Sequence, residues 1–177
     1  MVLPEGLILE VSVDFEDWNS KLSDYNKIII NVIYQIVKYV PEGKQLSKFQ
    51  HLELGIILCD DTFIRHLNKT FRNRDDVTNV LSFEGLSPDQ SKAMLQTDAP
   101  AQPFPQSLGE VYIAYETLKR EAELANITFS DHFTHLTIHG ILHLLGYDHI
   151  ENHEAEIMEA IETKLLNNLA IDDPYAA

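Results

Sequence analysis

Hydrophobic residues recur along the chain with two spacings, one typical of strands and one typical of helices. Four short segments are rich in Leu, Ile, Val and aromatic residues, which predicts strands. Five longer segments carry apolar residues three to four positions apart, which predicts helices with a buried face. The predicted strands cover residues 7–15, 51–58, 77–83 and 109–115, and the predicted helices cover 24–40, 62–71, 116–126, 131–145 and 153–169.

Small polar residues and Pro or Gly mark the ends of these helices. We expect Pro41 and Gly43 to end the helix over 24–40. We expect the Asp60–Asp61 pair and Ser130 to supply N-caps for the helices that follow them. In the helix over 62–71, the inward face is predicted to consist of Phe63, Ile64, Leu67 and Phe71.

Strands and helices together predict an α+β fold in a single domain over residues 1–177. We expect a mixed sheet of about four strands with helices mainly on one side. Residues 86–107 show little periodicity and contain four prolines, so we expect a Pro-rich surface loop there. No internal repeat divides the chain.

The helix predicted over 131–145 is apolar around most of its circumference. Such a helix belongs in the centre of the fold, so we expect a buried central helix. One of its faces consists of Phe133, Leu136, Gly140, Ile141 and Leu144. The remaining stripe consists of His132, His135, His139 and His143. The histidines of this helix are therefore expected to line an internal cleft.

Three histidines near the end of this helix have the spacing of metal ligands. His139 and His143 lie one helical turn apart on the same face. Gly146 can end the helix, so that the chain doubles back and brings His149 towards them. Three neutral imidazoles leave one tetrahedral position of a zinc ion open, which is typical of catalytic sites. The segment therefore predicts one zinc ion, since zinc is the usual metal for such a site.

Spacing alone leaves the roles of two neighbouring groups open. His135 lies four residues before His139, so it could bind the metal directly, hydrogen-bond to a ligand or simply pack. Asp148 is the nearest acidic group to the third histidine and could act as a general base or as a cap.

The spacing of these histidines is also similar to that of zinc proteases. Those enzymes need a Glu directly after the first histidine as general base. Gly140 stands at that position here. Peptide hydrolysis by that mechanism is therefore disfavoured.

Composition limits the setting and the partners. The formal net charge is −15, which disfavours loose, nonspecific binding to nucleic acid. Arg65, Lys69, Arg72 and Arg74 nevertheless lie within one short stretch and allow a local basic patch. Cys59 is the only cysteine, so no internal disulfide can form, and a cytoplasmic setting is the simplest interpretation. No apolar run approaches the length of a membrane span, and the N-terminus lacks the basic region of a signal peptide.

A second motif, over residues 67–83, runs from a helix end through a charged turn into a strand. Arg72 at this junction could present its guanidinium to a phosphate group in a bidentate manner. Alternatively, Arg72 could form a surface salt bridge with Asp75 or Asp76. Taken alone, the motif does not decide between the two.

Together the two motifs resemble the YbeY family of bacterial single-strand-specific endoribonucleases. The resemblance rests on residues 67–83, the Gly109–Glu110 step and residues 139–149. It implies an α+β fold, a zinc ion held by His139, His143 and His149, and an arginine at position 72 needed for RNA cleavage. It further implies maturation of the 3′ end of small-subunit ribosomal RNA, ribosome quality control, and ribosomal small-subunit proteins as partners.

Three positions depart from the family pattern. Val77 and Glu84 stand where the family commonly has Pro, and Glu110 stands where it usually has Asp. These changes affect substrate contacts more than chemistry, because the predicted ligands and Arg72 are all present.

Our leading hypothesis is therefore zinc-dependent hydrolysis of single-stranded RNA, with no action on DNA. Zinc would polarise a phosphoryl oxygen or activate water, and Arg72 would stabilise the developing charge. Whether the nucleophile is water or the RNA 2′-hydroxyl stays open. The alternatives are a non-catalytic ribosome-assembly factor with a structural zinc and, less favoured, a zinc metalloprotease.

Overall fold

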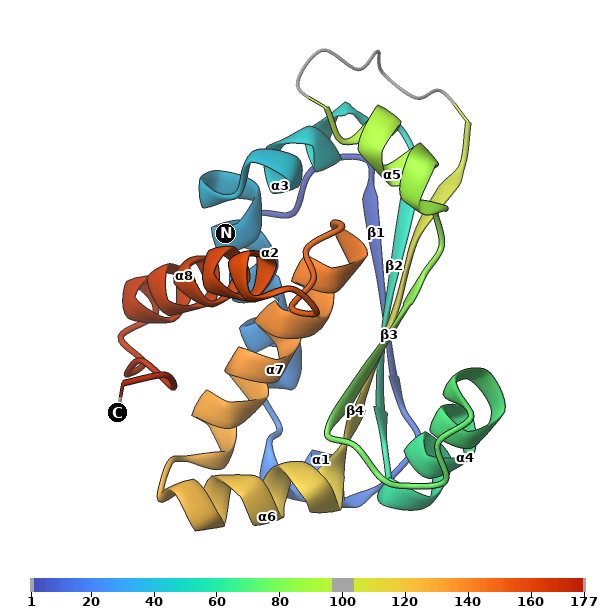
Figure 1. The fold of residues 1–177 in the computed structure, drawn as a ribbon. Coiled ribbons are helices and arrows are strands. Elements are labelled where there is room, and N and C mark those ends of the chain that lie inside the picture. Colours follow the sequence, from blue (N-terminus) through green and yellow to red (C-terminus); the bar gives the residue numbers. More distant parts are fainter. Residues whose placement is uncertain (1, 97–103, 177) are drawn as a thin grey trace.

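Four strands form one mixed sheet in the order β1–β2–β4–β3 (Figure 1). The computed structural model describes residues 2–96 and 104–176. β1 (Leu7–Val13), β2 (Leu52–Cys59) and β4 (Gln106–Ala114) run parallel, whereas β3 (Val80–Glu84) pairs with β4 in the antiparallel direction. The α+β class, the mixed sheet and its four strands are thereby confirmed.

Helices cover mainly one face of this sheet. On that face α7 (Phe129–Leu144) and α6 (Tyr115–Ala125) contact the strands, and α2 (Tyr25–Tyr39) and α8 (Asn152–Asn168) pack against α7. The opposite face is covered by α4 (Asp61–Arg72) at one end only (Figure 1). The remaining helices are α1 (Asp17–Lys21), α3 (Pro41–Gln45), a 3-10 turn at Leu46–Lys48, and α5 (Pro88–Met94).

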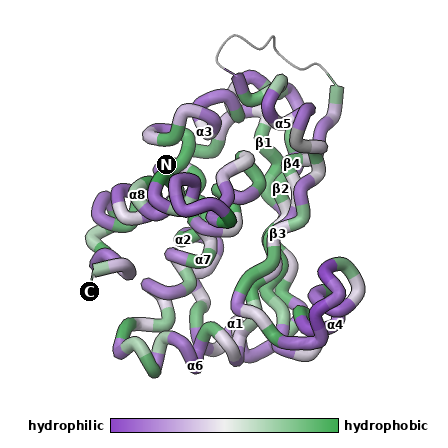
Figure 2. The backbone as a smooth tube through the Cα atoms, in the orientation of Figure 1, coloured by the Kyte–Doolittle hydropathy of each residue, from purple (hydrophilic) through white to green (hydrophobic). Residues whose placement is uncertain are grey.

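Successive side chains of β2 point to opposite faces of the sheet, and a separate hydrophobic core lies on each face. Ile56 and Leu58 belong to the main core under α2 and α7, whereas Cys59 belongs to a smaller core under α4. Successive side chains of a strand point to opposite faces, so a single strand serves both cores. Figure 2 shows mostly hydrophobic strands and a hydrophilic α4. The prediction of helices mainly on one side is confirmed.

Helix α7 is the central helix that the sequence predicts. It contacts β3, β4, α2, α6 and α8, and nine of its residues are buried. Gly140 allows this close approach: a Cβ there would lie 2.4 Å from Cγ1 of Val111 on β4. The Ser82 hydroxyl on β3 also donates a hydrogen bond of 2.9 Å to the Gly140 carbonyl. The histidine-bearing helix is thus held directly against the sheet.

The segment 86–107 is not the uninterrupted loop expected from its prolines. It contains the seven-residue helix α5, and β4 begins at Gln106. Ser87 and Gln90 form a capping box, and a Pro at the first turn is compatible with helix initiation. Leu86 and Leu95 are buried, so part of the segment packs on the fold. Pro100 and Pro103 lie outside the described residues.

The predicted helix ends are partly right. Thr128, not Ser130, caps α7, because its hydroxyl accepts a hydrogen bond from the Asp131 amide at 3.0 Å. Pro41 ends the helix over 24–40 as predicted, because α2 stops at Tyr39 and Val40 is extended. Gly43, in contrast, lies inside the next short helix, α3, which Pro41 begins. Asp60 caps α4 as predicted, through a bond of 2.7 Å from the Phe63 amide.

The predicted inward face of α4 is half right. Ile64 is fully buried and Leu67 packs against the smaller core. Phe63 and Phe71 remain 41% and 64% exposed, because α4 covers only one end of the sheet. Their rings lie against Tyr112 and Phe83 at the edge of that core.

Among the described residues, no helix is long and apolar enough to cross a bilayer.

Replacing Gly140 tests the packing of α7. The Gly140→Ala variant should lower the free energy of unfolding of the metal-free protein. Overpacking against Val111 costs about 1–3 kcal/mol, and at 2.4 Å it should exceed the ~1 kcal/mol that Ala gains over Gly in a helix. Urea denaturation measures the change.

Val111→Ala provides the matched test of the same contact. In the double variant the loss should be smaller than the sum of the two single losses, because the added methyl group then has space. A Gly140→Ala variant as stable as wild type, or additive effects, would show that this contact does not limit the approach of α7.

Candidate metal centre

The end of α7 and the turn after it bring three imidazoles together. His139, His143 and His149 each offer a nitrogen within 4.8 Å of the others. Gly146 adopts a φ of +92°, which a residue without a Cβ accepts readily. The Gly146 and Tyr147 amides then donate to the carbonyls of His143 and Leu142 and close the turn. The chain reverses, and His149 reaches the other two rings as the spacing predicts.

Hydrogen bonds on the far side of two rings determine which nitrogens face the centre. The Nδ1 of His143 lies 2.9 Å from the Tyr147 carbonyl, and the Nδ1 of His139 lies 2.8 Å from Oε1 of Glu162. Carbonyl and carboxylate oxygens only accept, so both Nδ1 atoms carry the proton. Both Nε2 atoms therefore present a lone pair.

These two Nε2 atoms lie only 3.0 Å apart. Two lone pairs at that distance repel unless a positive charge lies between or beside them. Burial, with the neighbouring His139 and His149, lowers the pKa of His143 to about 4, so this imidazole is neutral near pH 7. Neutral, deprotonated nitrogens are what a metal ion requires. The residues present therefore fit a bound transition metal ion.

Glu162 on α8 is a member of the centre that the sequence interpretation missed. Its carboxylate is fully buried and faces His135, His139 and Tyr175. Burial alone would raise its pKa, but hydrogen bonds from His135 and His139 outweigh burial and lower it to about 2. A carboxylate that accepts from a ligand histidine orients that ring. The available signal was a Glu between Met158 and Leu165 on the inward side of α8.

The role of His135 follows from the same carboxylate. Its Nε2 lies 2.8 Å from Oε2 of Glu162, so the hydrogen-bonding alternative is the one observed. His135, His139 and Glu162 also lie close enough to form a second metal-binding group. However, the Nδ1 of His139 is protonated if its Nε2 binds an ion. Because neutral imidazole has one free lone pair, one ion at the three-histidine group excludes the other site.

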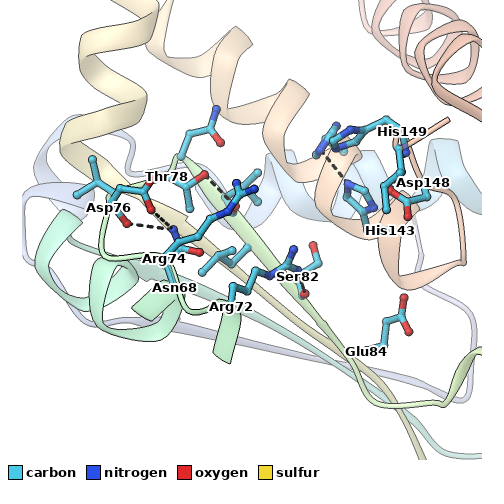
Figure 3. Close-up of a pocket in the computed structure, with 16 residues that line it drawn as sticks. Asn68, Arg72, Arg74, Asp76, Thr78, Ser82, Glu84, His143, Asp148 and His149 are labelled. Atoms are coloured by element: carbon cyan, nitrogen blue, oxygen red, sulfur yellow. Dashed lines mark hydrogen bonds between the residues drawn. The ribbon is translucent and has the colours of Figure 1, made fainter. Parts of the chain in front are cut away.

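An open cleft of about 740 Å³ leads to the three imidazoles. His143 and His149 lie on one side of it, and Arg72 and Arg74 approach from the other (Figure 3). Asp148 also lines the cleft, but its Oδ1 accepts a hydrogen bond from the His149 amide at 2.7 Å. Asp148 caps no helix, since Glu151 stands at the N-cap position of α8, and its bond fixes the carboxylate beside His149.

Arg72 ends α4 at the rim of this cleft. The helix stops because Asn73 adopts a left-handed conformation, with φ 56°. Arg65 and Lys69 both bind Asp75, whose pKa is lowered by the hydrogen bonds from Lys69 and Arg65. The guanidinium of Arg72 instead donates to the Ser82 carbonyl at 3.2 Å, and no carboxylate among the described residues pairs with it. The predicted salt-bridge alternative is therefore not observed.

The chain is similar to known proteins over most of its length. A family profile described as "Endoribonuclease YbeY" matches residues 12–170. A protein named Endoribonuclease YbeY from Sinorhizobium fredii is 40% identical over 172 residues, covering 96% of this chain and 92% of that protein. One of the same name from Agrobacterium fabrum is 38% identical, covering 97% and 96%.

A solved structure also shares the fold. The solution structure of a protein from Thermotoga maritima matches with a TM-score of 0.53 at 20% identity, covering 96% of this chain and all of that one. At this identity the likeness supports the fold alone.

Removing one ligand tests the three-histidine assignment. His143→Ala should lose the bound metal, because two imidazoles and water hold a zinc ion far more weakly than three. Elemental analysis of the purified protein measures the metal content. His66→Ala, an exposed position on α4, is the matched control and should keep it. Full occupancy in the His143→Ala variant would refute the assignment.

Proposed function

Because the chain belongs to the YbeY family of endoribonucleases, we propose that it is a zinc-dependent enzyme that cuts single-stranded RNA. The observation that carries this proposal is a cleft with two unlike ends. One end has three metal-binding nitrogens, and the other has an arginine without a carboxylate partner among the described residues. This pair of features suits a phosphodiester, which needs both charge neutralisation and positioning.

We propose that His139, His143 and His149 hold one zinc ion. A bound zinc ion supplies Lewis-acid chemistry at its free coordination position. Glu162 and the Tyr147 carbonyl keep both Nδ1 protons in place and so keep the ligand rings oriented. Arg72 presents N–H donors to the phosphoryl oxygens and stabilises the charge that develops on them.

The charge distribution supports binding of RNA at the cleft rather than over the whole surface. The whole chain has a formal charge of −15, so its surface does not attract nucleic acid in general. Arg72 and Arg74 line the cleft that also contains the imidazoles and place positive charge there. We propose that the physiological substrate is ribosomal RNA, at the 3′ end of the small-subunit species. We further propose small-subunit ribosomal proteins as partners and a cytoplasmic location.

Two other functions fit the structure less well. A purely structural zinc would have a closed set of four protein ligands, whereas this group of three opens onto a large cleft. A protease of the related histidine spacing would need a carboxylate at position 140. The Cβ direction there points at Val111 and Ser82 in the sheet, so no side chain from position 140 fits towards the cleft.

A direct assay of metal and substrate tests the proposal. Zinc-loaded protein should cut a defined single-stranded RNA, and it should leave the DNA of the same sequence intact. Removing the metal with a chelator should stop cleavage and adding zinc should restore it, with circular dichroism showing that the fold persists. RNA cleavage that survives complete metal removal would contradict the proposal, as would a folded, zinc-loaded protein without cleavage.

Arg72→Ala tests the phosphate-binding role separately from the metal. The variant should keep its zinc content and fold while cleavage falls about 100- to 1,000-fold, which is typical for loss of one donor to a developing oxyanion. Single-turnover cleavage of the same RNA measures this rate.

Two further variants sharpen that comparison. Arg72→Lys should recover only part of the rate, because Lys retains the charge without the planar fork. Arg120→Ala on α6 is the matched control outside the cleft and should cleave as wild type does. Unchanged turnover in Arg72→Ala would remove this residue from the mechanism.

A further inference from the structure

The segment that follows α8 folds back onto the metal centre. Ala170 adopts a left-handed φ of 59°, and the Ile171 amide donates to the Leu166 carbonyl at 3.0 Å, which turns the chain. Asp173 then anchors the segment, because its Oδ1 accepts from Thr163 on α8 at 3.0 Å and from the Tyr175 amide at 2.9 Å. These contacts return the ring of Tyr175 to the α7–α8 interface.

The hydroxyl of Tyr175 is hydrogen-bonded to the carboxylate of Glu162. It donates to Oε2, the same oxygen that lies 2.8 Å from Nε2 of His135. Burial and the hydrogen bond to Glu162 raise the pKa of Tyr175, so the hydroxyl stays protonated and remains a donor. The ring of Tyr175 also meets that of His135 edge to face, with centroids 5.8 Å apart.

The other oxygen of Glu162 faces the metal ligand. Oε1 accepts from Nδ1 of His139 at 2.8 Å. The carboxylate has no exposed surface, so no solvent replaces a donor that is lost. Losing the Tyr175 donor at Oε2 therefore affects how the Glu162 carboxylate is rotated, and with it the hydrogen bond between Oε1 and Nδ1 of His139.

We propose that Tyr175 is a positioning residue of the metal centre, whose hydroxyl holds Glu162 so that Glu162 holds His139 in its metal-binding tautomer and orientation. This inference rests on the three-histidine metal site of the proposed function. It makes the affinity for the metal depend on a segment more than 25 residues beyond the last ligand, His149.

Zinc affinity of the Tyr175→Phe variant tests the proposal. Phe keeps the ring and removes only the hydroxyl. Competition with a chromophoric chelator should show affinity reduced about 10-fold, in the range found when partners of a ligand histidine are lost. Glu162→Gln should lose as much or more, up to about 100-fold, because its amide has a single acceptor oxygen and cannot accept both from His139 and from the pair His135 and Tyr175 on the other side.

The chain contains a matched control for the tyrosine–glutamate bond. Tyr112 donates to Oε2 of Glu110 at 2.7 Å, on the sheet face that carries α4 rather than α7. Tyr112→Phe should therefore leave zinc affinity unchanged. Cobalt substitution gives a second readout, since the visible spectrum of the bound ion should change in Tyr175→Phe and not in Tyr112→Phe.

Each other outcome would overturn the inference in a defined way. Wild-type zinc affinity in Tyr175→Phe would exclude a positioning role. A lower melting temperature of the metal-free variant with unchanged affinity would show that Tyr175 serves stability alone. A zinc ion located between His135, His139 and Glu162 would show that Glu162 is itself a ligand.

The proposed function fails by different results. Wild-type protein that binds zinc but cuts no RNA contradicts the nuclease and leaves the role of Tyr175 intact. Tyr175→Phe with unchanged affinity, in an otherwise active enzyme, contradicts only the inference.

Discussion

The metal centre depends on two hydrogen bonds made on the far side of the imidazole rings. The Nδ1 atoms of His139 and His143 donate to acceptor-only oxygens, so both Nε2 atoms face inward as lone pairs 3.0 Å apart. That arrangement is unfavourable in an empty site and favourable around a cation. The protein holds it with groups that are themselves fixed: a carbonyl in the turn after α7 and a buried carboxylate on α8. The imidazoles are therefore preorganised to hold a cation.

Contacts with β3 and β4 fix the position of α7, the helix that carries His139 and His143. Because Gly140 lacks a Cβ, the helix approaches β4 closely, and the Ser82 hydroxyl ties it to β3. The preceding residue of β3, Leu81, points to the opposite face of the sheet and is buried under α4, the helix that ends in Arg72. One short strand thus lies between the imidazoles and the guanidinium. This fixed spacing across a cleft is what distinguishes a phosphodiester site from a metal site alone.

Much of this architecture could be predicted from the sequence. The four strands, the central helix and the grouping of His139, His143 and His149 follow from local periodicity and from the spacing around Gly146. The caps of α7 and the helix α5 were mispredicted because competing Ser, Thr and Pro signals lie within a few residues of one another. Phe63 and Phe71 were placed inside because periodicity does not reveal how far a helix extends over a sheet. Glu162 was missed because its partners come from α7 and from the segment after α8, and no spacing rule connects them.

The location of a bound zinc ion tests the account most directly. Anomalous diffraction from zinc-loaded crystals should give one peak per chain, within about 2.0–2.1 Å of nitrogens from His139, His143 and His149. Glu162 should remain outside coordination distance and hydrogen-bonded to His139. A peak between His135, His139 and Glu162, or no ordered ion at all, would contradict it.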